Sequence, residues 1–170
     1  DWEQDLDNLR AALRFGFDEA APAIAHELAL GLMSNSVMLW ARLGLRHEGW
    51  RWMQKAVAWR ERPDTGIGAQ ALTRIDHGHG VFVTYTQLGA PKEALAALRR
   101  ARPALEVAAD ATRLTMSWYS EFHLGLRVDP SAANAEVLSR MKALVQPDWP
   151  PLATRFAALF EGFLRRNAGD

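Results

Sequence analysis

The chain has 170 residues, and its 20 Lys and Arg side chains balance its 20 Asp and Glu side chains, so the formal net charge is zero. A neutral chain has no global field that would attract nucleic acid or an anionic membrane, so neither is expected as a direct partner. The absence of cysteine excludes disulfides, thiolate nucleophiles and thiolate zinc sites, and it is typical of a reducing, cytoplasmic compartment.

Apolar residues at helical spacing, interrupted by Gly and Pro, predict a single all-α domain over residues 1–170. In chain order, the expected helices cover about 2–15, 21–43, 47–61, 66–88, 91–107, 111–127, 131–145 and 150–166. Glycines after helical ends and a proline in a first turn support these boundaries. No apolar run approaches the roughly 20 residues that a membrane-spanning helix needs.

The last two expected helices carry matching apolar stripes, which predict an antiparallel terminal pair over residues 129–170. The stripe on the final helix consists of Leu152, Phe156, Leu159, Phe160, Phe163 and Leu164. Helical hairpins are expected over residues 1–128. Because the chain begins with Asp1 rather than Met, we expect it to be a segment of a longer protein.

An internal repeat of 45 residues is found when Gly44 is aligned with Gly89. This alignment pairs Gly49 with Ala94, Ala56 with Ala101, and Trp40 with Tyr85. A small residue early in the second helix of each hairpin lets the two backbones approach, and the aromatic residue fills the space between them. Hairpins of this kind stack to bury their apolar faces, as in a solenoid. Chance recurrence in an alanine-rich bundle is the alternative explanation.

Two stretches, LDNLRAALRF at 6–15 and LGLRHEGWRWMQKAV at 43–57, resemble the helical-repeat arm of bacterial signal-transduction ATPases and related transcriptional regulators. The matching positions are Asp7 to Leu13 in the first stretch, and Gly44, Glu48, Gly49 and Trp52 in the second. The resemblance implies a tetratricopeptide-like superhelical array of about eight antiparallel helices, placed after an ATPase core in regulators that bind DNA through another domain. It covers about the first third of the chain, and the repeat period here is longer than is usual for tetratricopeptides.

The expected function is recognition without catalysis, as a sensor or protein-interaction arm of a bacterial regulatory protein. The partner would be a protein, a peptide or another domain of the parent chain. None of the three lysines follows a glycine-rich phosphate loop, and no nucleophile-elbow sequence is present, so no cofactor and no enzyme activity are predicted. A small-molecule effector pocket in the same arm is the first alternative, and it would require a closed, mostly apolar cavity.

The candidate interaction groove follows from the repeat, which places a set of polar and apolar side chains on one face of successive helices. Its expected residues are Ser34, Met38, Arg42, Asp76, His79, Val83, Gln87, Thr115, Tyr119 and His123. The second alternative is a metal-dependent enzyme that uses the DHGHG segment, with Asp76, His77 and His79 as ligands. On a helix those three side chains diverge, because positions i, i+1 and i+2 do not share a face.

Overall fold

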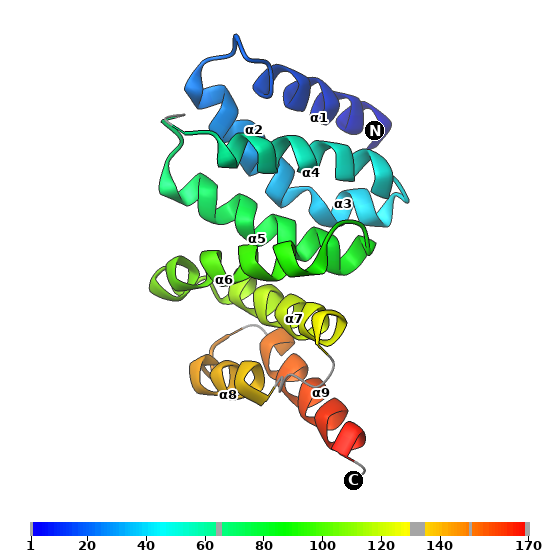
Figure 1. The fold of residues 1–170 in the computed structure, drawn as a ribbon, viewed down its shortest axis with the longest axis vertical. Coiled ribbons are helices and arrows are strands. Elements are labelled where there is room, and N and C mark those ends of the chain that lie inside the picture. Colours follow the sequence, from blue (N-terminus) through cyan, green and yellow to red (C-terminus); the bar gives the residue numbers. More distant parts are fainter. Residues whose placement is uncertain (1, 64–65, 130–134, 150, 169–170) are drawn as a thin grey trace.

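A computed structural model describes residues 2–63, 66–129, 135–149 and 151–168, and all regular structure in these ranges is helical. The helices are α1 (Trp2–Gly16), α2 (Ala23–Asn35), α3 (Val37–Arg42), α4 (Arg46–Glu61), α5 (Ala69–Thr86), α6 (Pro91–Val107), α7 (Ala111–Val128), α8 (Ala135–Leu144) and α9 (Pro151–Ala168). They are stacked along the long axis of the molecule, with α1 at one end and α9 at the other (Figure 1). The all-α prediction is confirmed. Residues 131–134, the start of one predicted helix, lie outside the described ranges.

The single helix predicted over residues 21–43 is wrong, because the chain breaks at Ser36 into α2 and α3. Ser36 lies outside the helical region, with φ −89° and ψ 3°. Its hydroxyl donates to the Met33 carbonyl at 3.2 Å and accepts the indole N–H of Trp40 at 3.0 Å. A serine side chain that bonds the local backbone in this way competes with helix continuation, and the sequence periodicity does not reveal it.

Helix α5 lies at the centre of the stack and contacts α2, α3, α4, α6 and α7 (Figure 1). Every residue from Ile75 to Thr84 is buried, so this helix has no open face along most of its length. Two glycines permit the close packing. A Cβ atom at Gly78 would lie 2.9 Å from the Ser34 Cα in α2, and one at Gly80 would collide with the Leu98 side chain of α6.

Gly49, the small residue of the first repeat copy, is buried where α4 packs against Trp40 of α3. Trp40 itself is fully buried. In the second copy, Ala94 and Ala101 are also buried. Tyr85 departs from the pattern, because its ring is only half-buried and stacks on Tyr119 of α7, with centroids 5.7 Å apart.

An ion pair joins the two stretches on which the family resemblance depends. Arg10 in α1 donates from Nε and Nη2 to the two carboxylate oxygens of Glu48 in α4, at 2.7 Å each. These hydrogen bonds hold the pKa of Glu48 below its usual value. The pair therefore fixes the first helix against the first repeat hairpin.

At the other end, α8 and α9 contact each other and α7. Trp118, Phe122, Met141 and Phe160 form the buried centre of this region. Of the predicted stripe on α9, Phe160 is buried, whereas Leu159 is 58% exposed. No helix in the described ranges is both long and apolar enough to cross a bilayer.

Candidate functional site

Asp76, predicted as a groove residue, is instead buried between two arginines from neighbouring helices. Arg60 of α4 donates to its two carboxylate oxygens at 3.1 and 3.2 Å, and Arg100 of α6 does so at 3.1 and 2.8 Å. Each arginine therefore makes the paired, two-bond contact that suits guanidinium and carboxylate geometry. Asp76 links α4, α5 and α6, so its carboxylate is occupied inside the protein.

His77 and His79 face different helices, as the helical spacing predicts. The Nε2 atom of His77 lies 3.1 Å from the carbonyl oxygen of Arg113 in α7, whereas His79 lies beside Trp50 of α4. Burial, together with the positive charge of Arg113, lowers the pKa of His77 to about 4, and burial also lowers the pKa of His79. Within the described ranges, no group of three His, Asp or Glu side chains could hold a metal ion.

The ten predicted groove residues do not form one open surface. Val83 is fully buried, and Thr115 is buried with its hydroxyl donating to the Ala111 carbonyl at 2.7 Å. Gln87 ends α5 in the left-handed conformation, with φ 62°, and its side chain donates to the Thr84 carbonyl. The groove prediction is therefore corrected for Asp76, His79 and Val83, because α5 is covered from Ile75 to Thr84. It is also corrected for Thr115, which is buried in α7, whereas Gln87 is exposed at the end of α5.

The remaining predicted residues fall into separate places. Tyr119 is sandwiched among aromatic rings, with Phe156 at 4.8 Å, and His123 lies 4.4 Å from Tyr119. Burial lowers the pKa of His123. Arg42 is exposed at the end of α3. Ser34 and Met38 line a cavity.

That cavity has a volume of about 230 Å³ and lies between α2, α3, α5 and α7. Its apolar part comes from Val37, Met38, Val81 and Met116. Its polar part comes from Ser34, Asn35, His77, Thr112 and Arg113. We call it the Met38 cavity.

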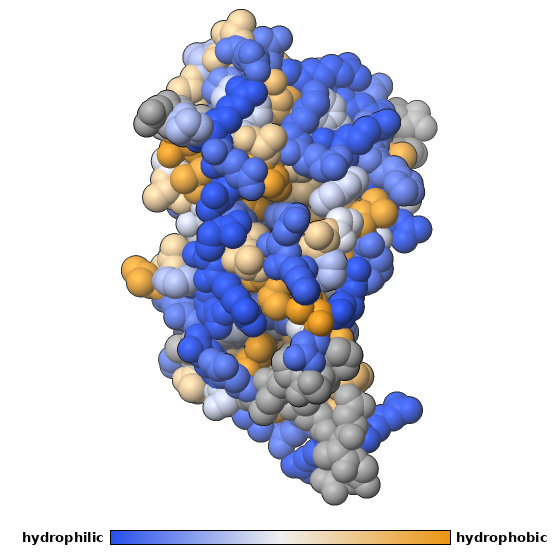
Figure 2. Space-filling model, in the orientation of Figure 1, coloured by the Kyte–Doolittle hydropathy of each residue, from blue (hydrophilic) through white to orange (hydrophobic). Residues whose placement is uncertain are grey.

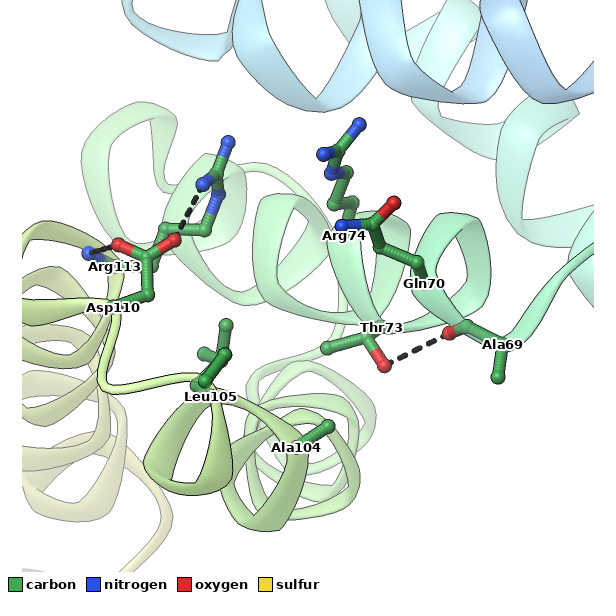
Figure 3. A pocket seen from close by; sticks show the side chains of 9 residues that line it. Ala69, Gln70, Thr73, Arg74, Ala104, Leu105, Asp110 and Arg113 are labelled. Atoms are coloured by element: carbon green, nitrogen blue, oxygen red, sulfur yellow. Dashed lines mark hydrogen bonds and ion pairs between the residues drawn. The ribbon is translucent and has the colours of Figure 1, made fainter.

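A second cavity, of about 330 Å³, lies between α5, α6 and α7. It is lined by Ala69, Gln70, Thr73, Arg74, Ala104, Leu105, Ala108, Asp110 and Arg113. Figure 3 shows Leu105 and Ala104 on one side, while Arg74 and Arg113 extend in a common direction on the other. We call it the Leu105 cavity.

Arg113 lines both cavities and is held in place between them. Its Nη1 lies 2.6 Å from an Asp110 carboxylate oxygen, and its Nη2 donates to the Asn35 side-chain oxygen at 3.1 Å. Asp110 also caps α7 by accepting the backbone N–H of Arg113. Arg74 differs, because no acidic side chain in the described ranges forms an ion pair with it.

Sequence reasoning missed Arg74, Leu105 and Arg113. One local signal was available, since Asp110 is a favourable N-cap residue, which predicts that α7 begins at residue 111 with Arg113 in its first turn. No family model, curated protein or solved structure matches the chain. The adjoining cavities are therefore the main guide to function.

Figure 2 shows one face of the molecule, on which hydrophobic residues form scattered patches within a mainly hydrophilic surface. Scattered hydrophobic residues are normal on a protein surface. On the face shown, recognition would therefore depend on shaped cavities and placed charges more than on a broad apolar surface.

Proposed function

We propose that the chain is a non-catalytic recognition domain, the sensor or interaction arm of a bacterial regulatory protein. The ligand is an extended peptide segment of a partner protein or of the parent chain. The observation that carries the proposal is that the Met38 and Leu105 cavities adjoin at Arg113. Successive contacts of α2 and α3 with α5, and of α5 with α7, support a tetratricopeptide-like stack as the scaffold.

The chemistry of the two cavities suits a peptide with an acidic group beside apolar side chains. Met38 and Met116 are flexible and polarisable, so they can adapt to different apolar side chains. Leu105 offers a second apolar contact in the adjoining cavity, beyond Arg113, which lines both cavities. Arg74 and Arg113 present guanidinium groups on the same side, where a carboxylate can accept paired hydrogen bonds.

A small-molecule effector is the second candidate, and the Leu105 cavity favours it. Its volume of about 330 Å³ falls at the lower end of the range for small-molecule sites, roughly 300 to 1,000 Å³. The peptide and the small molecule differ in how much of the protein surface each would contact. A peptide would contact both cavities, whereas a small molecule would need only the Leu105 cavity.

The test is selection of peptides from a random displayed library against the purified chain. Enrichment of sequences with an acidic residue flanked by apolar residues is expected. Met38→Glu should abolish their binding, because it places a carboxylate in the Met38 cavity. Leu39→Glu is the matched control, since Leu39 is the neighbouring exposed residue and does not line either cavity.

Both variants should retain the helical circular dichroism of the original chain. Peptides that bind the Met38→Glu variant as tightly as the original chain would rule out the Met38 cavity. If binding is also lost in Leu39→Glu, the effect is not specific to this surface. Failure to enrich any peptide would contradict the peptide proposal, and small carboxylates would then be titrated against the Leu105 cavity.

A further inference from the structure

A strongly charged cavity of about 310 Å³ lies between α6, α7 and α8. Its lining residues are Arg99, Arg102, Glu121, Glu136, Val137 and Arg140. None of these residues lines the Met38 or Leu105 cavity, so this is a separate site. We call it the arginine cavity.

The arginine cavity has more hydrogen-bond donors than its own acceptors use. Each guanidinium carries five N–H groups, and the only carboxylates among the lining residues are Glu121 and Glu136. Arg140 pairs with Glu136 at 3.3 Å, in an exposed contact within α8. In the described ranges, no acidic side chain forms an ion pair with Arg99.

The buried carboxylate of Glu121 does not use all the hydrogen-bond donors of Arg102, the third arginine of the cavity. Nη2 of Arg102 lies 2.9 Å from Oε1 of Glu121, close enough for an ion pair. That oxygen nevertheless has no aligned hydrogen bond from the protein, so the attraction between the two groups is electrostatic. Glu121 is only 2% exposed. Donor capacity on Arg102 is therefore left for another acceptor.

The charge balance of the cavity is positive. Its three arginines outnumber its two carboxylates. Burial raises the pKa of Glu121, although Arg102, Arg99 and Arg140 act against this rise. A carboxyl group that binds a proton more readily than usual neutralises less of the arginine charge around it. An anion entering the cavity would meet a net positive field.

We propose that the arginine cavity binds the phosphate group of a small molecule, with Arg99, Arg102 and Arg140 as donors. A phosphate oxygen pair matches the planar fork of a guanidinium, and several oxygens can serve several arginines at once. Val137 is the only apolar lining residue, so the remainder of the ligand is polar. A volume of about 310 Å³ leaves room for such a remainder.

Calorimetric titration with inorganic phosphate at pH 7.5 tests this proposal, with ionic strength held constant by sodium chloride. Saturable binding at one site per chain is expected. Arg99→Gln should weaken it by at least about tenfold, which corresponds to the loss of a charge-assisted hydrogen bond. Arg46→Gln removes the same charge from an exposed position on α4, and it should bind phosphate like the original chain.

Acetate, titrated in parallel, distinguishes a phosphate site from a general anion site. Acetate should bind at least about tenfold more weakly, since it offers two oxygens and one charge. Arg140→Gln is a second variant whose side chain is half-exposed, so loss of folding is not expected to obscure its effect. Thermal unfolding without phosphate confirms that each variant is folded. Three outcomes would each overturn the proposal. They are a chain that shows no saturable phosphate binding, a chain that binds acetate as tightly as phosphate, and Arg99→Gln and Arg46→Gln variants that bind phosphate with the same affinity.

Discussion

A Cβ atom added to Gly49 would lie 2.7 Å from the Cβ of Trp40, closer than two such atoms can approach. Gly49→Ala should therefore destabilise the fold, by about 1 kcal/mol or more, because overpacking outweighs the helical preference for alanine. The Trp40 contact involves atoms next to the backbone, which cannot move aside as a flexible side-chain end can. Urea denaturation measures the difference in unfolding free energy.

Gly31→Ala provides the matched control within another helix. Apart from the backbone of its own helix and its chain neighbours, no atom in the described part of the chain lies within 4 Å of the position that its Cβ would occupy. This substitution should stabilise the protein by about 0.5 to 1 kcal/mol, because it removes the entropic disadvantage of glycine in a helix interior. Equal effects of the two alanine substitutions would show that α3 and α4 do not approach as closely as the structure indicates.

The Trp40 and Gly49 contact was predictable because a repeat encodes a local requirement, a small residue where two adjacent helices cross. The central position of α5 was not predictable in this way. Its glycines at 78 and 80 each accommodate a different neighbouring helix, and nothing in the local sequence indicates which one. Contacts with helices distant in sequence decide which faces of α5 are covered, and helical periodicity does not reveal these contacts.

The second prediction concerns the carboxylate of Asp76, which pairs with Arg60 and Arg100. Asp76→Asn should lower the unfolding free energy by about 1.5 to 3 kcal/mol, because hydrogen bonds between charged groups are lost at a buried position. Arg60→Gln or Arg100→Gln alone should cost less, since the other arginine still pairs with Asp76. Chemical denaturation of the single and double variants gives the coupling energy.

The exposed pair between Arg62 and Glu19 serves as the control for this measurement. Glu19→Gln should change stability by at most about 0.5 kcal/mol, because exposed ion pairs contribute little. A similarly small effect of Asp76→Asn would show that the ion pairs of Arg60 and Arg100 with this carboxylate contribute little to the stability of the fold.

The third prediction concerns two buried serine hydroxyls on α7. The side-chain oxygens of Ser117 and Ser120 are buried and have no hydrogen-bond partner in the described part of the chain. Removing an unsatisfied buried hydroxyl avoids its desolvation penalty. Ser117→Ala and Ser120→Ala should each raise the melting temperature, by about 2 to 4 °C for a gain near 1 kcal/mol. A lower melting temperature would mean that a buried water satisfies these hydroxyls.

The candidate site was less predictable than the fold, and the reason is visible in its residues. Arg113 lines both cavities because α2, α5 and α7 converge there, and its partner Asn35 is distant in sequence. A groove placed by repeat symmetry assumes that each copy leaves the same face open. That symmetry fails at Val83, which is fully buried, whereas Met38, the residue one repeat earlier, lines a cavity.

The last prediction is a loss of stability between neutral pH and pH 5 that depends on His77. Burial, with the nearby charge of Arg113, lowers the pKa of this imidazole from its ordinary value of 6.5 to about 4 in the folded protein. Well above pH 6.5 the ring is neutral in both states, so its full contribution to stability is present. As the pH falls, the unfolded chain binds the proton first, and stability is lost until the folded pKa is passed.

The expected contribution of His77 between pH 7.5 and pH 5 is on the order of 2 kcal/mol. His77→Phe keeps a flat ring but cannot be protonated there, so this variant should lose less stability than the original chain over that interval. Its stability at pH 7.5 should be lower, because the contact with the Arg113 carbonyl is gone. Glu121, whose raised pKa acts in the opposite direction, is present in both proteins and cancels in the comparison.

His47→Phe, at an exposed position, should retain the original acid dependence. Urea denaturation at the two pH values measures these differences, and equal losses for all three proteins would show that His77 takes up a proton in the folded state as readily as in the unfolded one.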